Sequence, residues 1–110
     1  MRILLLACLA APLSWAGESP NPWACAAEKR VPVDPQVQIK VLDECARQGN
    51  ASAMFVLANR LRDKQAAREL LLRAAELEHA ESLYQLGLEE KDPQKAAQYM
   101  KLAAHALQHR

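Results

Sequence analysis

The stretch "AAELEHAESLYQLG", residues 74–87, decides the fold because it recurs along the chain at a fixed offset. The segment "CARQGNASAMFVLA", residues 45–58, lies 29 residues earlier and matches it in its small and apolar positions. Asp34, Asp63 and Asp92 are spaced by the same 29 residues, and each is followed two positions later by glutamine. A fixed period of this size is typical of a helical solenoid, in which one unit stacks on the next.

Each unit predicts two helices. The first begins at the aspartate, a residue type that favours the N-cap, and Pro35 and Pro93 suit the first helical position. The second is expected over residues 51–62 and again over 80–91, where the apolar side chains follow the three-to-four spacing of an amphipathic helix. We therefore expect an all-α fold, a short α-solenoid of about five antiparallel helices in which one opening helix is followed by two pairs.

The same residues resemble a known family. "AAELEHAESLYQLG" is similar to the core of a Sel1-like repeat, a relative of the tetratricopeptide repeat, and "DPQKAAQYMKLAA", residues 92–104, resembles the helix that opens with Asp-x-x-Lys-Ala. The matches cover residues 34–107, although this unit of 29 residues is shorter than the family's usual repeat and has Glu78 where the family has glycine. The resemblance implies a scaffold that binds proteins or peptides.

Three segments are expected along the chain. Residues 1–16 have the layout of a cleaved signal peptide, with Arg2, a short apolar run and small residues before Gly17. Residues 17–33 contain three prolines and predict an extended arm, and residues 34–110 form the repeat domain. In an exported protein Cys25 and Cys45 are expected to form one disulfide, which would tie the arm to the first helix; the alternative is a pair of buried thiols. The predicted location is therefore the periplasm or the extracellular space.

Charge and composition argue against several function classes. Loss of Arg2 with the leader leaves 13 basic and 13 acidic residues, and no cluster of Lys and Arg indicates nucleic-acid binding. After the leader no apolar stretch is long enough to span a bilayer, so stable membrane insertion is not expected. No motif for a nucleotide, a metal or another cofactor occurs, and an enzyme is not predicted.

The histidines are assigned structural roles. His79 occupies the repeat position that Asn50 fills one unit earlier, at the turn between helices, where either side chain can satisfy free amides at a helix end. His105 and His109 have a spacing that can hold a metal ion, but two ligands do not make a site, and they are interpreted as an exposed terminal turn.

A binding surface is expected on the second helix of each pair. By analogy with the grooves of tetratricopeptide repeats, the concave side would carry Phe55, Asn59, Tyr84 and Leu88. The two aromatic rings are candidate anchors for a partner, or else pack between neighbouring helices. Trp23 is a further candidate, or covers one end of the stack.

The function expected from these observations is a non-enzymatic, exported adaptor that binds a protein or peptide, with self-association left open. The alternative is an inhibitor such as a periplasmic immunity protein, which binds and neutralises a toxin or an enzyme. The sequence does not separate the two.

Overall fold

The computed structural model describes residues 21–109, and within them the fold is all-helical without strands. A short 3-10 helix, η1 (Ala27–Lys29), precedes five α-helices, which are α2 (Pro35–Arg47), α3 (Ala51–Ala58), α4 (Lys64–Glu76), α5 (Ala80–Glu89) and α6 (Pro93–Gln108). The predicted signal peptide, residues 1–16, lies outside the described residues.

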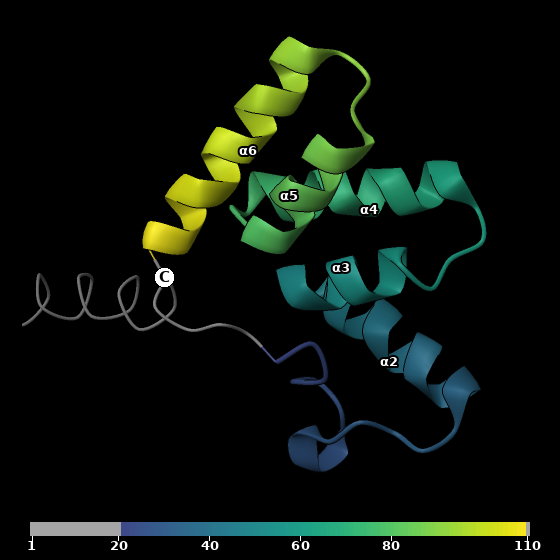
Figure 1. Cartoon of the computed structure of the whole chain (residues 1–110). Coiled ribbons are helices and arrows are strands. Elements are labelled where there is room, and N and C mark those ends of the chain that lie inside the picture. Colours follow the sequence, from purple (N-terminus) through teal and green to yellow (C-terminus); the bar gives the residue numbers. More distant parts are fainter. Residues whose placement is uncertain (1–20, 110) are drawn as a thin grey trace, which may run out of the picture.

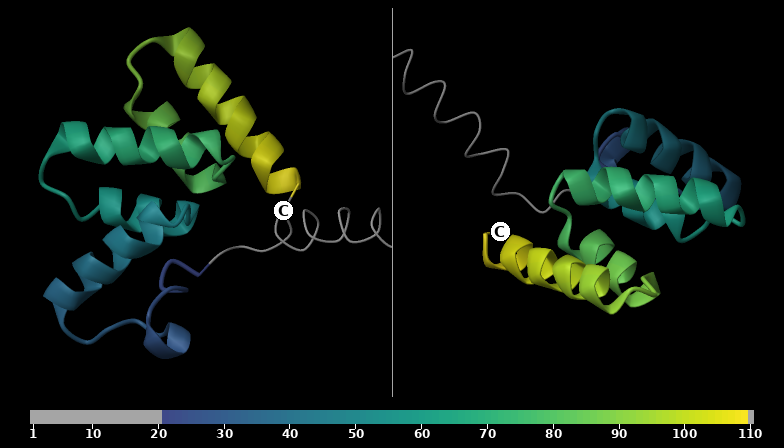
Figure 2. Two further views of the ribbon diagram at one scale, coloured as in Figure 1. Left: turned by 180° about the vertical axis from the view of Figure 1, so that it is seen from behind. Right: turned by 90° about the horizontal axis from the view of Figure 1, so that it is seen from above.

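The five α-helices stack in chain order. Each packs mainly on its neighbours in the sequence, so that α2 contacts α3, α3 contacts α4, α4 contacts α5 and α5 contacts α6. Figure 1 shows this succession from α2 to α6, and the two further views keep the same order (Figure 2). Nearest-neighbour packing of this kind is the arrangement of a repeat protein. The prediction of a short all-α helical repeat is therefore confirmed.

The predicted N-caps of the first helices are confirmed. The backbone of each aspartate is extended, and its carboxylate accepts a hydrogen bond from the amide two residues later, at 2.9 Å for Asp34, 3.0 Å for Asp63 and 3.0 Å for Asp92. Such caps satisfy amides that have no partner inside the helix. The Asp-x-Gln signature of the sequence therefore marks the start of α2, α4 and α6.

The second helices are shorter than predicted. The sequence indicated residues 51–62 and 80–91, whereas α3 ends at Ala58 and α5 ends at Glu89. After α3 the carbonyl of Phe55 accepts from both the backbone amide of Asn59 at 3.2 Å and its side-chain amide at 2.9 Å. After α5 the backbone of Glu90 is extended, as the approach to the next N-cap requires. Both helices therefore end before the helix-forming composition does.

The joints α2–α3 and α4–α5 are built alike. In both, the helix closes with paired hydrogen bonds of the Schellman type, in which two successive amides donate back to the last turn: Gly49 to Ala46 (3.0 Å) and Asn50 to Cys45 (3.1 Å), then Glu78 to Ala75 (2.9 Å) and His79 to Ala74 (3.2 Å). This motif needs a residue with positive φ, and Gly49 has φ of 93° while Glu78 has 59°. Glu78 thus adopts the backbone conformation for which glycine is the usual residue.

The arm contains turns and is not uniformly extended, contrary to the prediction for residues 17–33. Asn21 organises its described part, because its side-chain oxygen accepts from the amide of Trp23 at 3.0 Å and its side-chain amide donates to the carbonyl of Lys29 at 3.1 Å. Trp23 is buried in the core cluster that α2 and α3 form around Leu42, Ala53 and Leu57. The arm therefore covers the α2 end of the stack.

Cys25 of the arm and Cys45 of α2 lie at disulfide distance, with their Cα atoms 5.5 Å apart. This is within the usual range for a disulfide. Asn50 adds a second link between the arm and the stack by donating to the carbonyl of Asn21 at 2.8 Å. The predicted cysteine pairing thus agrees with the geometry, and it would fix the arm to the first helix pair.

Candidate functional site

An open, mainly apolar groove runs along α5 and α6. Its volume is about 670 Å³, and it is lined by side chains of three helices: Phe55 from α3, Ala80, Glu81, Tyr84, Gln85 and Leu88 from α5, and Met100, Ala103, Ala104 and Leu107 from α6. Tyr84, Leu88 and Leu107 are each more than half exposed. The groove therefore leaves large apolar side chains in contact with solvent.

Three of the four predicted groove residues come together here. Phe55, Tyr84 and Leu88 all line the groove, and Phe55 also packs against the core cluster that joins α3, α4 and α5. The two rings differ in their surroundings. Phe55 is half-buried between helices, as expected of a ring that packs in the stack, whereas Tyr84 is exposed, as expected of an anchor for a partner.

Asn59 lies outside the groove lining. Its amide and that of Gln85 bond reciprocally, with 3.1 Å in each direction, and this pair ties the end of α3 to the middle of α5. Sequence reasoning placed Asn59 by analogy, and it could not foresee that the side chain is taken up by a second amide. The α6 lining residues were missed for a different reason, since only the second helix of each pair was considered as a source of groove residues.

Close packing of α5 on α6 forms the floor of the groove. A Cβ atom at Gly87 would lie 2.9 Å from Cε of Met100 and 3.3 Å from Cβ of Tyr99. A larger residue at this position would displace the flexible end of the Met100 side chain and press on Tyr99. The small residue that the repeat pattern places at this position brings α6 near enough to α5 for Met100 to enter the groove lining.

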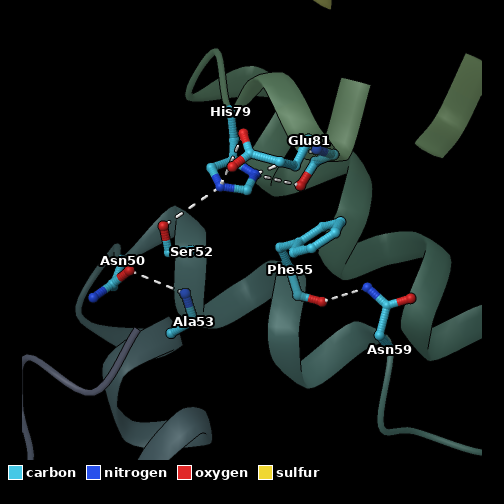
Figure 3. A network of polar contacts seen from close by, with 8 residues as sticks. Asn50, Ser52, Ala53, Phe55, Asn59, His79 and Glu81 are labelled. Atoms are coloured by element: carbon cyan, nitrogen blue, oxygen red, sulfur yellow. Dashed lines mark hydrogen bonds and ion pairs between the residues drawn. The ribbon is translucent and has the colours of Figure 1, made fainter. Parts of the chain in front are cut away.

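His79 caps α5 at one end of the groove. Its Nδ1 accepts from the amide of Ser82 at 3.3 Å and lies 2.8 Å from the Ser82 hydroxyl, while its Nε2 is 3.4 Å from Oγ of Ser52 and 3.9 Å from Oε1 of Glu81. Figure 3 shows the imidazole beside the Phe55 ring and directed toward Ser52, and the two ring centroids are 5.4 Å apart. The predicted equivalence with Asn50 is confirmed, because Asn50 caps α3 by accepting from the amide of Ala53 at 3.0 Å.

The cap also determines what the histidine can do chemically. Since Nδ1 accepts a backbone hydrogen bond, the proton of the neutral ring resides on Nε2, the nitrogen that faces Ser52 and Glu81. A ring in this tautomer is placed to donate toward Ser52. The cluster is thus organised as a helix cap that bridges α3 and α5.

The other two histidines lie beside each other at the end of α6. The rings of His105 and His109 lie with their centroids 4.2 Å apart on the exposed end of α6. Within residues 21–109 no group of three or more His, Cys, Asp or Glu side chains could hold a metal ion. In the same part of the chain no helix is both long enough and apolar enough to cross a membrane.

Comparison with known proteins adds no assignment: no family model matches the chain, and the curated proteins and the solved structures yield no match either. The fold and the groove are therefore the basis for the function proposed below.

Proposed function

We propose that this protein is a small, non-enzymatic, exported scaffold of the Sel1-like repeat type, which binds a protein or peptide in the groove between α5 and α6. The observation that carries the proposal is the grouping of exposed apolar side chains, above all Tyr84, Leu88 and Leu107, along one groove. Contiguous exposed apolar surface of this kind marks interaction sites in small soluble domains.

Export is supported by the cysteine pair. Cys25 and Cys45 lie at disulfide distance, and disulfides persist in oxidising compartments such as the periplasm and the extracellular space. The Sel1-like assignment is supported by the repeat itself, because the joints, the caps and the small residues at helix contacts recur with the period on which the resemblance was based.

Site-specific photo-crosslinking tests the proposal. A photoreactive phenylalanine analogue is placed at position 84 in the groove, or at position 102, which is an equally exposed leucine outside the lining, and the protein is expressed with its natural partners present. We expect one defined adduct from position 84 that is absent from position 102. Equal crosslinking from both positions, or none from position 84, would contradict the groove assignment.

A further inference from the structure

The 29-residue register allows the groove to be compared with a covered surface of the same molecule. In this register α6 is the counterpart of α4, so Met100 corresponds to Leu71 and Ala104 corresponds to Ala75. Leu71 is 2% exposed, because it packs in one cluster with Ala58 of α3 and Leu86 of α5. α4 is thus covered on both sides, by the helix before it and by the helix after it.

In the described part of the chain, α6 is covered by the helix before it, α5, but no helix follows to cover its other side. Met100 is close to Gly87, which replaces Ala58 in the register, yet no helix after α6 takes the place of Leu86. As a result Met100 is only half-buried where Leu71 is buried, and Ala104 is exposed where Ala75 is half-buried. Leu107 continues this exposed face, although its counterpart Glu78 lies past the end of α4. The burial of the repeated aromatic side chain differs in the same way. Phe55 is half-buried beside His79, whereas its counterpart Tyr84 is exposed.

The molecule also shows what kind of element fits such a surface. The buried face of α5 is formed by Ala80, Leu83 and Leu86. Leu86 shares a cluster with Leu71 of α4, Ala80 and Leu83 share one with Ala103 and Ala106 of α6, and Ala75 of α4 packs against both clusters. The corresponding face of α3 is formed by Ala51, Met54 and Leu57. Its residues have the same spacing, and a small side chain is again followed by two long apolar ones. Two helices of one pattern therefore already serve this structural role.

We propose that the α6 face formed by Met100, Ala104 and Leu107 binds one amphipathic α-helix of another protein, whose apolar face repeats the Ala80–Leu83–Leu86 pattern of α5. The bound helix extends the stack by one element and continues the packing already present between α4 and α5. This inference rests on the proposed function, and it names the class of partner that the groove accepts.

A second copy of the chain is a poor source of that helix. Both faces with the required pattern are occupied within the molecule, since Ala51, Met54 and Leu57 of α3 and Ala80, Leu83 and Leu86 of α5 are all buried. α6 has the same spacing at Ala96, Tyr99 and Leu102, but Tyr99 already packs against the clusters that contain Leu83 and Leu86 of α5. The partner is therefore expected to be a different protein.

The probe is a synthetic peptide with the sequence of residues 79–91, labelled with a fluorophore. Because an isolated helix of this length is marginal in water, it is stapled between the positions of Gln85 and Glu89, on the side away from the apolar face. Its binding to the purified full chain is followed by fluorescence anisotropy. We expect saturable binding, and about ten-fold weaker binding of a stapled peptide in which the leucine at position 86 is replaced by glutamate.

Two leucines of α6 provide a matched pair of protein variants. Leu107 lines the groove and is 57% exposed, whereas Leu102 lies outside the lining and is 53% exposed. Leu107→Glu should weaken peptide binding about ten-fold, and Leu102→Glu should leave it unchanged. Circular dichroism of both variants checks that they remain folded, and a Leu107→Ala variant with an intermediate effect would confirm that contact area is what matters.

Several results would overturn the inference. These are the absence of saturable binding, equal loss with both leucine variants, and undiminished binding of a peptide that contains proline at position 86 and cannot be helical. Sedimentation of the chain alone provides a further test, because a dimer that Leu107→Glu dissociates would identify a second copy as the occupant. Binding that appears only when residues 1–16 are removed would identify that segment as the occupant.

The failure of this inference can be distinguished from failure of the proposed function. If position 84 crosslinks a natural partner but the helical peptide does not bind, the groove is a binding site and the occupant is not a helix of the α5 pattern. If the peptide binds with the expected dependence on Leu107, the helix-binding face is established independently of the crosslink.

Discussion

At the α2 end of the stack a segment from outside the repeat covers the first two helices, whereas at the α6 end the corresponding surface is open. Trp23 of the arm is 8% exposed and packs among Leu42, Ala53 and Leu57, and the Arg60 guanidinium lies 5.8 Å from the centroid of its ring. Tyr84, the aromatic residue of the opposite end, is 53% exposed. The end units of a helical repeat need cover; within the described residues the α2 end has such cover, whereas the α6 end leaves apolar side chains exposed.

The largest expected effect is that of removing the cover at the α2 end. Trp23→Ala should lower the free energy of unfolding by about 3 kcal/mol or more, because a large buried ring is replaced by a cavity. Tyr84→Ala should cost less than about 1 kcal/mol, because this ring is mostly in solvent. Chemical denaturation of both variants measures the difference, and equal losses would show that the two ends are not covered unequally.

The next effect concerns the link between the arm and α2. If Cys25 and Cys45 form a disulfide, reduction should lower the stability by about 3 kcal/mol, since the bond closes a loop of moderate length in the unfolded chain. The double variant Cys25→Ser/Cys45→Ser should be destabilised to a similar degree and should not respond to reductant. Intact mass after alkylation without reductant checks the bond directly, and two alkylated thiols per chain would exclude it.

A smaller effect is expected at the joint that leads to the open end. His79→Ala removes the N-cap of α5 and the contact with Ser52, and should cost about 1–2 kcal/mol. His79→Asn should cost less, since asparagine is a preferred cap and performs this role at position 50. Thermal denaturation ranks the variants, and an asparagine variant as unstable as the alanine variant would show that capping is not what matters at this position.

The smallest expected effect on stability concerns the residue with positive φ in each joint, Gly49 between α2 and α3 and Glu78 between α4 and α5. Glu78→Gly should raise the stability by about 1 kcal/mol, because Glu78 has positive φ and glycine adopts this conformation without strain. The control is Gly49→Ala, where an added Cβ would meet nothing within 4 Å, so that only the backbone cost of about 1 kcal/mol remains. If neither variant changes the melting temperature, positive φ carries no cost in these joints.

Most of the fold was predictable because the period transfers information between units. Asp34, Asp63 and Asp92 indicated the helix starts, and equivalence with Asn50 indicated the cap role of His79. The early end of α3 was not predictable from composition, since residues 59–62 consist of residue types that also occur inside helices. The fold of the arm around Asn21 has no repeat equivalent from which it could be inferred.

The candidate site was predictable only in part. Repetition of an aromatic residue indicated Phe55 and Tyr84, and both line the groove. The contribution of α6 depends on how nearly it approaches α5, which is a property of three-dimensional packing at Gly87.

The central claim is that the α6 face is a vacant repeat position and that the α2 end is already filled. Two methionines report on the two ends, since Met54 is buried in the cluster with Trp23 and Met100 lines the groove. We predict that in protein labelled with ¹³C at the methionine methyl groups, saturating stapled peptide of residues 79–91 shifts the Met100 resonance and leaves that of Met54 in place. An unchanged Met100 resonance, or equal shifts of both, would contradict the account.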